Sequence, residues 1–337
     1  MTTHQVMEVI DRGGLGLVLL VDGQGKLVTT LTDGDIRRAI LDGVETEDSV
    51  AEVKQSKIKQ GRLKPLTLLH DAEKSAQIEL MRERQVRYLP LVDSENVPME
   101  LSILDKLVPV EKRKIQAVVM AGGEGTRLHP LTLDTPKPML PVKGKPILEW
   151  IVEGLKNAGI HQLNISTNYK AGQIVDHFKQ GEGFGVNIGY LEEDAPLGTA
   201  GALSLMETPA EPFIVMNGDI FTDMDFESLV HFHHDHKADI TVCVRKYHFT
   251  VPYGVIRSEK SLLTALEEKP RMDFFVNAGI YLVEPKMLSY IPKRVHFDMT
   301  DLLQVALDEG LTVATFPVIE EWVDIGKHED YRKVNES

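Results

Sequence analysis

Residues 117–150, AVVMAGGEGTRLHPLTLDTPKPMLPVKGKPILEW, join a short apolar run to a glycine-rich turn and a proline-punctuated loop. The run at 115–121 has the length and β-branched content of a strand buried on both faces, which favours a parallel strand. Three glycines follow it: Gly122, Gly123 and Gly125. Glycines let backbone N–H groups line a concavity that accepts phosphate oxygens. Arg127 adds a planar set of donors and Lys137 lies between two prolines, so the segment predicts a polyphosphate site at a strand end.

The glycines alone do not identify a ligand. Their spacing differs from the GxxxxGK[ST] of a P-loop and from the GxGxxG of dinucleotide folds. A tight turn between a strand and a loop, with no ligand, explains the three glycines equally well. The identification of a site therefore depends on the cations and on the rest of the chain.

Strand-like and helix-like stretches alternate after residue 115. The expected strands are 115–121, 162–167, 187–192, 212–217, 239–244 and 254–256. The expected helices between them include 146–158, 170–180, 200–206 and 227–235. Such alternation predicts an α/β fold with a mostly parallel, Rossmann-like sheet and helices on both faces. Ligands in such folds bind beyond the carboxyl ends of the strands, where the glycine-rich turn falls.

Length and composition indicate two globular domains. The 337 residues are 42% hydrophobic, and a short charged segment at 109–114 separates two apolar-periodic regions. We therefore expect one domain at 1–112 and a second at 113–337.

The charge and the absence of apolar runs limit the partners. A formal net charge of −14 argues against nucleic acid, because binding to DNA or RNA draws much of its affinity from cations on phosphates. The chain has no run of about 18 apolar residues, so no membrane span is expected. It also starts without a basic leader followed by an apolar stretch, and its single cysteine excludes an internal disulfide. These features favour the cytoplasm.

Two aspartates follow apolar strand-like runs at distant places in the chain. Asp219 ends FIVMNGD, and Asp324 lies in EWVDIG. Two carboxylates beside a polyphosphate are what Mg²⁺ prefers, with phosphate and water as its other ligands. Either aspartate alone is more often a turn or helix-cap residue. Together they predict a Mg²⁺ site.

The whole string from Gly122 to Glu149 resembles the motif of the sugar nucleotidyltransferases, GGxGTRLxPLTxxxPKPMLPVxxKPILE. The resemblance implies a GT-A-like nucleotidyltransferase domain that holds Mg²⁺ between Asp219 and Asp324. It implies catalytic roles for Arg127, Lys137, Asp219, Lys269 and Asp324. It also implies a nucleotide site made by Ala121, Gly122, Gly123, Gly125, Thr126, Glu193, Gly198 and Thr199.

The same resemblance extends to the second substrate. Residues 267–270, EEKP, match a family motif in which the Glu binds sugar hydroxyls and the Lys binds the sugar phosphate, here Glu268 and Lys269. The NAGIY segment implies contacts from Asn277 and Gly279, and Gly254 gives backbone access to the same pocket. Without these neighbours, a Glu-Lys pair before a proline is an ordinary solvated loop.

One loop bears on the choice of base. In the family, the segment EEDAPLGTAG lies along the base, with Gly198 near it and a side chain at Glu193 facing its hydrogen-bonding edge. An ionised carboxylate only accepts hydrogen bonds, which suits the adjacent N1–H and N2–H donors of guanine and opposes the O4 of uracil. GTP is therefore favoured, although cytosine also offers an amino donor.

An imperfect repeat occupies the first domain. LLVDGQGKLVTTLTDGD and LPLVDSENVPMELSILD each run strand, turn, strand and [ST]xxD, after a helix-like stretch at 4–12 or 72–84. This α-β-β-α repeat resembles a tandem cystathionine-β-synthase (CBS) module, a family that commonly binds adenine nucleotides. The resemblance makes Thr32, Asp35, Ser102 and Asp105 candidate ligand contacts. A purely structural, dimerising module with helix caps at these positions is the equal alternative.

The combined architecture resembles the bacterial glucosamine-1-phosphate guanylyltransferases of legionaminic acid synthesis. It implies transfer of a nucleotidyl group from a nucleoside triphosphate to a sugar 1-phosphate, with pyrophosphate released, in a homo-oligomer. Alternatives with the same fold are a mannose- or heptose-1-phosphate guanylyltransferase, or a uridylyl-, thymidylyl- or cytidylyltransferase. The alternative from another class is an inactive, nucleotide-sensing regulatory protein.

Overall fold

The computed structural model describes residues 1–13, 16–62, 64–84, 86–107 and 115–336. The chain divides into two compact units, Met1–Arg113 and Lys114–Ser337. The segment expected to link them, 109–114, lies outside the described residues. Each unit is therefore considered by itself.

The first unit contains the α-β-β-α repeat expected from the sequence. The first copy consists of α1 (Thr3–Gly13), β1 (Leu17–Val21), β2 (Leu27–Thr32) and α2 (Asp33–Leu41). The second consists of α4 (Lys74–Glu83), β4 (Tyr88–Val92), β5 (Pro98–Ile103) and α5 (Leu104–Leu107). In each copy the two strands pair antiparallel. Between the copies lie α3 (Val50–Lys59) and the short β3 (Leu68–Leu69), which pairs parallel with β4.

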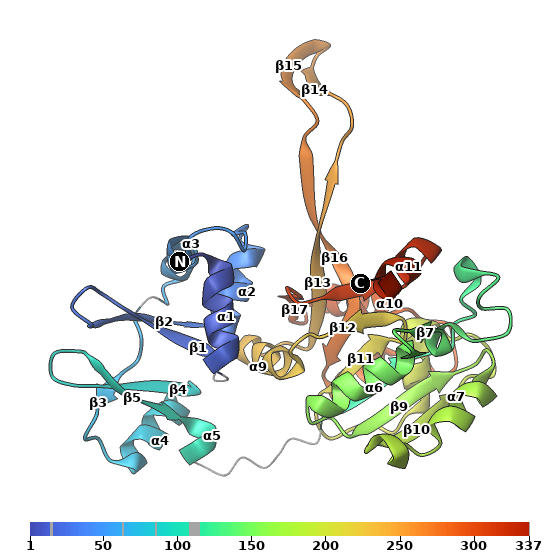
Figure 1. The fold of residues 1–337 in the computed structure, drawn as a ribbon, viewed down its shortest axis with the longest axis horizontal. Coiled ribbons are helices and arrows are strands. Elements are labelled where there is room, and N and C mark those ends of the chain that lie inside the picture. The colour runs from blue at the N-terminus through green and yellow to red at the C-terminus, as the bar shows by residue number, and fades with distance from the viewer. Residues whose placement is uncertain (14–15, 63, 85, 108–114, 337) are drawn as a thin grey trace. The chain divides into compact units, whose positions relative to one another are not determined.

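The second unit is built on a seven-stranded sheet of order β10-β9-β6-β11-β16-β13-β17 (Figure 1). The bounds are β6 Gln116–Met120, β9 Gln162–Thr167, β10 Asn187–Glu192, β11 Phe213–Asn217, β13 Ile240–Thr250, β16 Arg271–Val283 and β17 Val313–Pro317. The first four strands in this order pair parallel, and β13 pairs parallel with β17. The sheet is mostly parallel, as expected for this α/β fold.

The central sheet differs from the expectation at two places. β16 runs antiparallel between β11 and β13, where no strand was expected. Residues 254–256 are not in the central sheet: they begin β14 (Val255–Glu259), which pairs with β15 (Leu262–Glu267) as a separate two-stranded sheet. The expected helix at 200–206 is shorter, with α8 (Gly198–Gly201) followed by a 3₁₀ turn (Ala202–Leu205).

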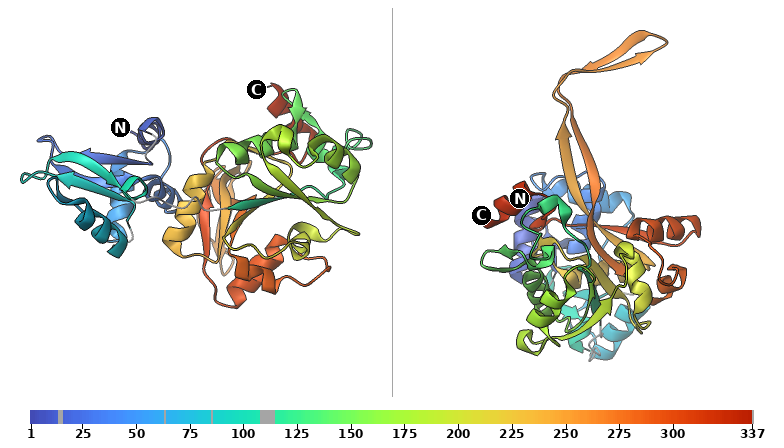
Figure 2. Two further views of the ribbon diagram at one scale, coloured as in Figure 1. Left: turned by 90° about the horizontal axis from the view of Figure 1, so that it is seen from below. Right: turned by 90° about the vertical axis from the view of Figure 1, so that its right-hand side faces the viewer.

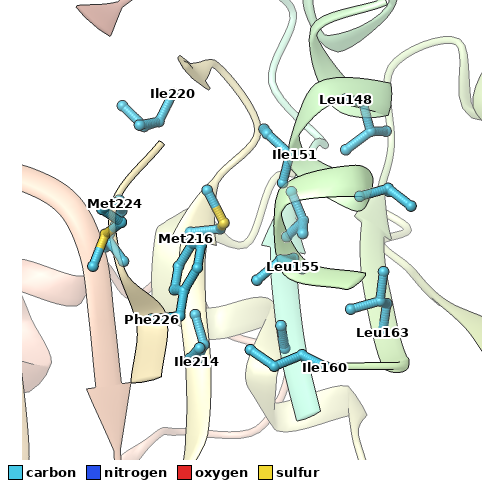
Figure 3. Close-up of a cluster of buried hydrophobic side chains, with 14 of the residues drawn as sticks. Leu148, Ile151, Leu155, Ile160, Leu163, Ile214, Met216, Ile220, Met224 and Phe226 are labelled. Carbon is cyan, nitrogen blue, oxygen red and sulfur yellow. The ribbon is translucent and has the colours of Figure 1, made fainter. Parts of the chain in front are cut away.

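Helix α6 (Ile147–Asn157) shows how helices close over the sheet. Its apolar side chains recur at helical spacing, and Leu148, Ile151 and Leu155 are buried against side chains of the strands. Figure 3 shows this cluster, in which Ile214 and Met216 of β11 face the helix. The other long helices of this unit are α7 (Ala171–Phe178), α9 (Phe226–His236), α10 (Met299–Asp308) and α11 (His328–Glu336).

Short elements complete this unit. The paired strands are β7 (Pro141–Val142) with β8 (Lys145–Pro146), and β12 (Ile220–Thr222) with β18 (Trp322–Asp324). The remaining 3₁₀ turns are Thr126–Leu128, Lys137–Met139, Glu182–Phe184 and Pro285–Tyr290. None of the helices, in the part of the chain that the structure describes, is long and apolar enough to cross a bilayer.

A long β-ribbon projects from the second unit. Strands β13 and β16 continue outward beyond the sheet as an antiparallel pair, and the β14–β15 hairpin extends them further (Figure 1). Figure 2 shows the ribbon from a second direction, again standing clear of the rest of the unit. We call residues 246–275 the arm.

Candidate active site

A cavity of about 400 Å³ opens at the carboxyl ends of β6, β9 and β11. Parallel strands deliver their following residues to one edge of the sheet, which explains why segments distant in sequence meet here. Eleven of the residues predicted for the site line the cavity: Ala121, Gly122, Gly123, Gly125, Thr126, Arg127, Lys137, Glu193, Gly198, Thr199 and Asp219. The volume lies in the range of small-molecule sites.

Lys137 lies close to the backbone of the glycine-rich turn. Gly125 has φ = +65°, and a Cβ at this position would lie 2.9 Å from Cβ of Lys137 and 3.0 Å from Cγ2 of Thr132. A side chain would therefore be excluded both by the left-handed backbone and by these two neighbours. The Thr132 hydroxyl donates to the carbonyl of Gly125 at 2.8 Å and fixes the turn. Lys137 begins a 3₁₀ turn directly after Pro136.

Asp219 and Asp324 lie side by side although 105 positions separate them in the sequence. Strands β12 and β18 pair so that Ile220 is opposite Asp324, and the amide of Ile325 donates to the carbonyl of Asp219 at 3.1 Å. One carboxylate oxygen of Asp219 (Oδ2) pairs with the ammonium group of Lys137. The other, Oδ1, is buried with no hydrogen-bond partner among the described residues.

The pKa of Asp324 depends on the same neighbouring charges. Desolvation raises the pKa of Asp324, and the negative charge of Asp219 raises it further, while Lys137 and Arg127 oppose the shift. The Asp324 side chain is exposed, so solvent screens both effects. An unpartnered buried oxygen beside a second carboxylate is the donor set that a hard divalent cation prefers. Asp219 and Asp324 therefore fit Mg²⁺.

Glu193 has a structural role in addition to its place at the cavity. Its Oε2 accepts the backbone N–H of Leu197 at 2.9 Å, which closes the loop between β10 and α8. Its Oε1 lies against Gly122, where a Cβ would approach to 2.7 Å. One oxygen thus holds the loop, and the other faces the glycine-rich turn.

Thr199 forms hydrogen bonds to the segment at the start of α10. Its backbone N–H and its hydroxyl both donate to Oδ1 of Asp298, at 2.9 and 3.2 Å, and its hydroxyl accepts from the amide of Met299 at 2.9 Å. These bonds join the loop after β10 to the start of α10. Thr199 therefore lines the cavity, and its hydroxyl group holds the loop in place.

The structure adds cavity residues that the motif did not indicate. They are Met120, Leu128, Pro138, Ser166, Pro196, Asn217, Gly218, His296 and Gly326. Ser166 and Asn217 lie near the carboxyl ends of β9 and β11, so the rule that parallel strands present ligand-binding residues at these ends would have found them. His296 lies in an irregular loop, and no feature of its local sequence marks it.

The residues predicted for the second substrate do not all come to the cavity. Asn277 donates to the hydroxyl of Tyr281 at 2.6 Å and accepts from the amide of Gly279 at 2.9 Å, at the base of the arm. A Cβ on Gly279 would lie 2.7 Å from the side-chain amide nitrogen of Asn217. This part of β16 therefore packs against a residue that lines the cavity. Gly254, Glu268 and Lys269 lie together on the arm and do not line the cavity.

In the first unit, the predicted ligand contacts are occupied by neighbouring groups. Thr32 caps α2 in a reciprocal capping box with Asp35. Asp35 is 5% exposed, and its carboxylate pairs with Lys57 at 2.7 Å and Arg38 at 2.6 Å. Ser102 is buried and donates to Gln77. The side chain of Asp105 lies outside the described part of the structure.

Comparisons with known proteins identify the family of the second unit. A model of the nucleotidyl transferase family matches residues 116–337. The chain belongs to this family. Its relatives include UTP–glucose-1-phosphate uridylyltransferase from Synechocystis sp., 33% identical over 242 residues, which cover 64% of this chain and 61% of that protein. The catalytic subunit beta of mannose-1-phosphate guanylyltransferase from Drosophila melanogaster is 35% identical over 231 residues, with 64% and 60% covered. The chain thus spans less than two thirds of the length of these curated relatives.

Solved structures of the same family share the fold. A putative glucose-1-phosphate thymidylyltransferase from Bacillus anthracis has a TM-score of 0.54 and 28% sequence identity, covering 66% of this chain and 94% of that one. HddC from Yersinia pseudotuberculosis, complexed with GMP-PN, has a TM-score of 0.52 and 28% identity, with coverage of 66% and 98%.

Proposed function

We propose that this protein is a sugar-1-phosphate nucleotidyltransferase that uses GTP. The observation that carries the proposal is the convergence of a glycine-rich turn, Arg127, Lys137 and Asp219 on one cavity, with Asp324 beside Asp219 and with no hydrogen-bond partner for Oδ1 of Asp219 among the described residues. The family membership of residues 116–337 supports the reaction class, and relatives named as sugar-1-phosphate guanylyl- and uridylyltransferases support the two substrates.

The reaction is a single in-line displacement. An oxygen of the sugar 1-phosphate attacks the α-phosphorus of the nucleoside triphosphate and forms the new P–O bond. The bond from the α-phosphorus to the bridging oxygen breaks, and pyrophosphate leaves with that electron pair. The nucleophile is already an anion, so no side chain has to remove a proton from it. Catalysis then requires positioning and neutralisation of charge.

The described residues supply these two needs. The backbone of the glycine-rich turn wraps the phosphates. Arg127, which lines the cavity and is exposed to solvent, also binds them. Lys137 neutralises charge on the reacting phosphates, for which it exchanges its pairing with Asp219 for a phosphate oxygen. Asp219 and Asp324 would hold Mg²⁺, which when bound neutralises phosphate charge and orients the triphosphate.

Guanine is favoured because of Glu193. With Oε2 committed to Leu197, a carboxylate oxygen at this position remains an acceptor for the N1–H or N2–H of guanine. The solved relative complexed with GMP-PN supports a guanine nucleotide in this fold. UTP is the second candidate, because one of the relatives most similar to the chain is named as a uridylyltransferase.

The sugar and the role of the first unit are further proposals. Glucosamine 1-phosphate is suggested by the resemblance of the whole chain, and mannose 1-phosphate by the names of the relatives. An adenine nucleotide in the first unit would have to displace Lys57 or Arg38 from Asp35, or use other atoms. An inactive, purely regulatory protein is disfavoured because Arg127, Lys137, Asp219 and Asp324 are all present.

The decisive experiment is a matrix of substrates. Pyrophosphate release is measured for each of GTP, UTP, dTTP and CTP with glucosamine, mannose and glucose 1-phosphates, in the presence of Mg²⁺. We expect GTP to be preferred, and we expect Asp219→Ala to reduce turnover by a factor of about 10³ or more with an unchanged melting temperature. The matched control is Asp176→Asn, an exposed aspartate of α7. No release with any pair, or full activity of Asp219→Ala, would contradict the proposal.

A further inference from the structure

The arm has one apolar face that nothing in the described chain covers. Tyr247 pairs with Phe274, and Phe249 pairs with Met272, so these four side chains share one face of the ribbon. They are 55%, 51%, 51% and 44% exposed in the order Tyr247, Phe274, Phe249, Met272. The opposite face carries the polar pairs His248 with Asp273 and Thr250 with Arg271, and an apolar Phe275 opposite Lys246 where the arm begins.

The tip of the arm continues this pattern. Ile256 pairs with Leu266, and Ser258 pairs with Leu263 across a β-bulge, so Ile256, Leu263 and Leu266 share a face of the β14–β15 hairpin. Their exposed fractions are 61%, 63% and 64% in that order. An isolated two-stranded ribbon is marginally stable in water, and an exposed apolar face of this extent indicates a protein contact. The arm is therefore built to pack against a surface.

The arm also carries charged groups that the reaction needs. Glu268 and Lys269 lie at the junction between the tip and the ribbon, beside Gly254. Both are exposed, and no described residue forms an ion pair or hydrogen bond with the Lys269 side chain. The cavity itself is lined by two strong cations, Arg127 and Lys137, and two anionic substrates have to meet there. A cation for the second phosphate is therefore missing from the cavity and present on the arm.

The arm does not bring Lys269 to the cavity of its own chain. β16 is continuous from Arg271 to Val283, and the β13–β16 register is regular from Lys246↔Phe275 to Thr250↔Arg271. At about 3.3 Å per residue, Lys269 lies on the order of 25 Å from Asn277, which is at the base of the arm. A regular ladder resists the sharp bend that a return to the base would need.

We infer that the arm docks on a second copy of this chain and places Lys269 and Glu268 in that copy's active site. This rests on the proposed function, because it assigns Lys269 to the phosphate of the second substrate. A second copy is the favoured occupant because it presents both the cavity that lacks this cation and an identical arm. In a two-fold dimer, one exchange covers both apolar faces and completes both sites.

The test is complementation between two inactive variants. Asp219→Asn inactivates the cavity of its own chain, and Lys269→Ala removes the cation from its own arm. The two chains carry different affinity tags, are co-expressed, and the doubly tagged hetero-oligomer is purified. In a two-fold dimer, one of its two sites combines an intact cavity with an intact arm, so we expect about half of the wild-type turnover. Each variant alone should show about 1% or less.

The outcomes separate this inference from the proposed function. An inactive hetero-oligomer, formed from two inactive parents, means that the arm closes over its own chain and overturns the inference alone. Failure to isolate any hetero-oligomer also overturns it. Full activity of the Asp219→Asn parent instead contradicts the proposed function.

Two double variants test the docking of the apolar face without changing Asp219 or Lys269. Phe249→Ser with Phe274→Ser should lower turnover at least tenfold, because the apolar face no longer docks. His248→Ser with Asp273→Ser, on the opposite face of the same ribbon, should leave turnover within about twofold of wild type. Equal effects of the two double variants would overturn the inference. Circular dichroism verifies that both retain the fold.

Discussion

The ammonium group of Lys137 pairs with Oδ2 of Asp219 across the cavity, while Oδ1 of the same carboxylate stays buried and unpartnered. The two groups come from the loop after the glycine-rich turn and from the end of β11, so the pair joins the two halves of the site. The ammonium group of Lys137 thus supplies positive charge beside the two carboxylates. Nucleotide and metal binding must separate the two groups.

Replacing Lys137 should therefore have opposite effects on catalysis and on metal binding. Lys137→Met should lower turnover by about 10²-fold or more, because charge on the reacting phosphates is no longer neutralised. It should also strengthen Mg²⁺ binding in the absence of nucleotide, since Asp219 loses a competing cation. Steady-state kinetics and calorimetric titration with Mg²⁺ measure the two effects. Lys156→Met, on the exposed side of α6, is the control, and weaker Mg²⁺ binding by Lys137→Met would contradict the argument.

Glu193 offers a test of base selection that preserves the loop. Glu193→Gln keeps an oxygen for the N–H of Leu197, so the loop should stay closed. The terminal group that replaces Oε1 is then an uncharged NH2 donor, which weakens recognition of the guanine N–H groups. We expect kcat/KM for GTP to fall about 10- to 100-fold and the ratio of UTP to GTP activity to rise. Glu192→Gln, at the exposed neighbouring position, should change neither value. An unchanged nucleotide preference in Glu193→Gln would exclude Glu193 from base recognition.

Much of the cavity lining was predictable because one continuous motif contains it. The segment from Gly122 to Lys137 is local in sequence, and its glycines and prolines restrict the backbone directly. Asp219 was predictable for a different reason: it follows a buried parallel strand, and such strand ends meet at one edge. The parallel pairing of β6 with β9 and β11 follows from the alternation of strands and helices, but the order of the strands came from the structure.

The arm was not predictable from local pattern. The motifs at 267–270 and 277–281 were identified from the sequence, but no strand was expected at 246–250 or 271–275. The alternation of apolar and polar residues in these two segments is typical of half-buried strands, but their pairing partners are about 25 residues apart. Periodicity identifies a face but not what covers it. For the same reason Lys269 could be assigned to a substrate by resemblance, while its distance from the cavity of its own chain required the structure.

In the first unit, the stability of the second helix should depend on Lys57. Its ammonium group lies in the interior, 2.7 Å from Asp35 and 2.6 Å from the carbonyl of Thr30. Lys57→Met leaves Asp35 paired with Arg38, and removal of one partner from a buried pair costs up to about 3–5 kcal/mol. Hydrogen exchange in peptides of α2 and α3 should therefore accelerate. Lys59→Met, exposed on the same helix α3, is the matched control, and equal exchange in both variants would contradict the prediction.

His233 should make the second unit sensitive to acid. The imidazole on α9 is 1% exposed and contacts the hydroxyl of Thr241 at 2.8 Å, and burial lowers the pKa of His233 from 6.5 to about 4. Between pH 6.5 and pH 4 the unfolded chain binds a proton at this residue that the folded chain does not. The free energy of unfolding should therefore be fully supported above pH 6.5 and fall as the pH drops toward 4, by on the order of 2–3 kcal/mol.

The measurement is urea unfolding of the full chain at several pH values, followed by a signal from the second unit. His233→Gln retains hydrogen-bonding groups but does not titrate, so its free energy of unfolding should change less between pH 6.5 and pH 4 than that of wild type. His161→Gln, at an exposed position before β9, should follow the wild-type pH profile. A pH profile of His233→Gln that coincides with wild type would show that another group controls the acid sensitivity, and that protonated His233 is tolerated beside Glu284, 3.3 Å away.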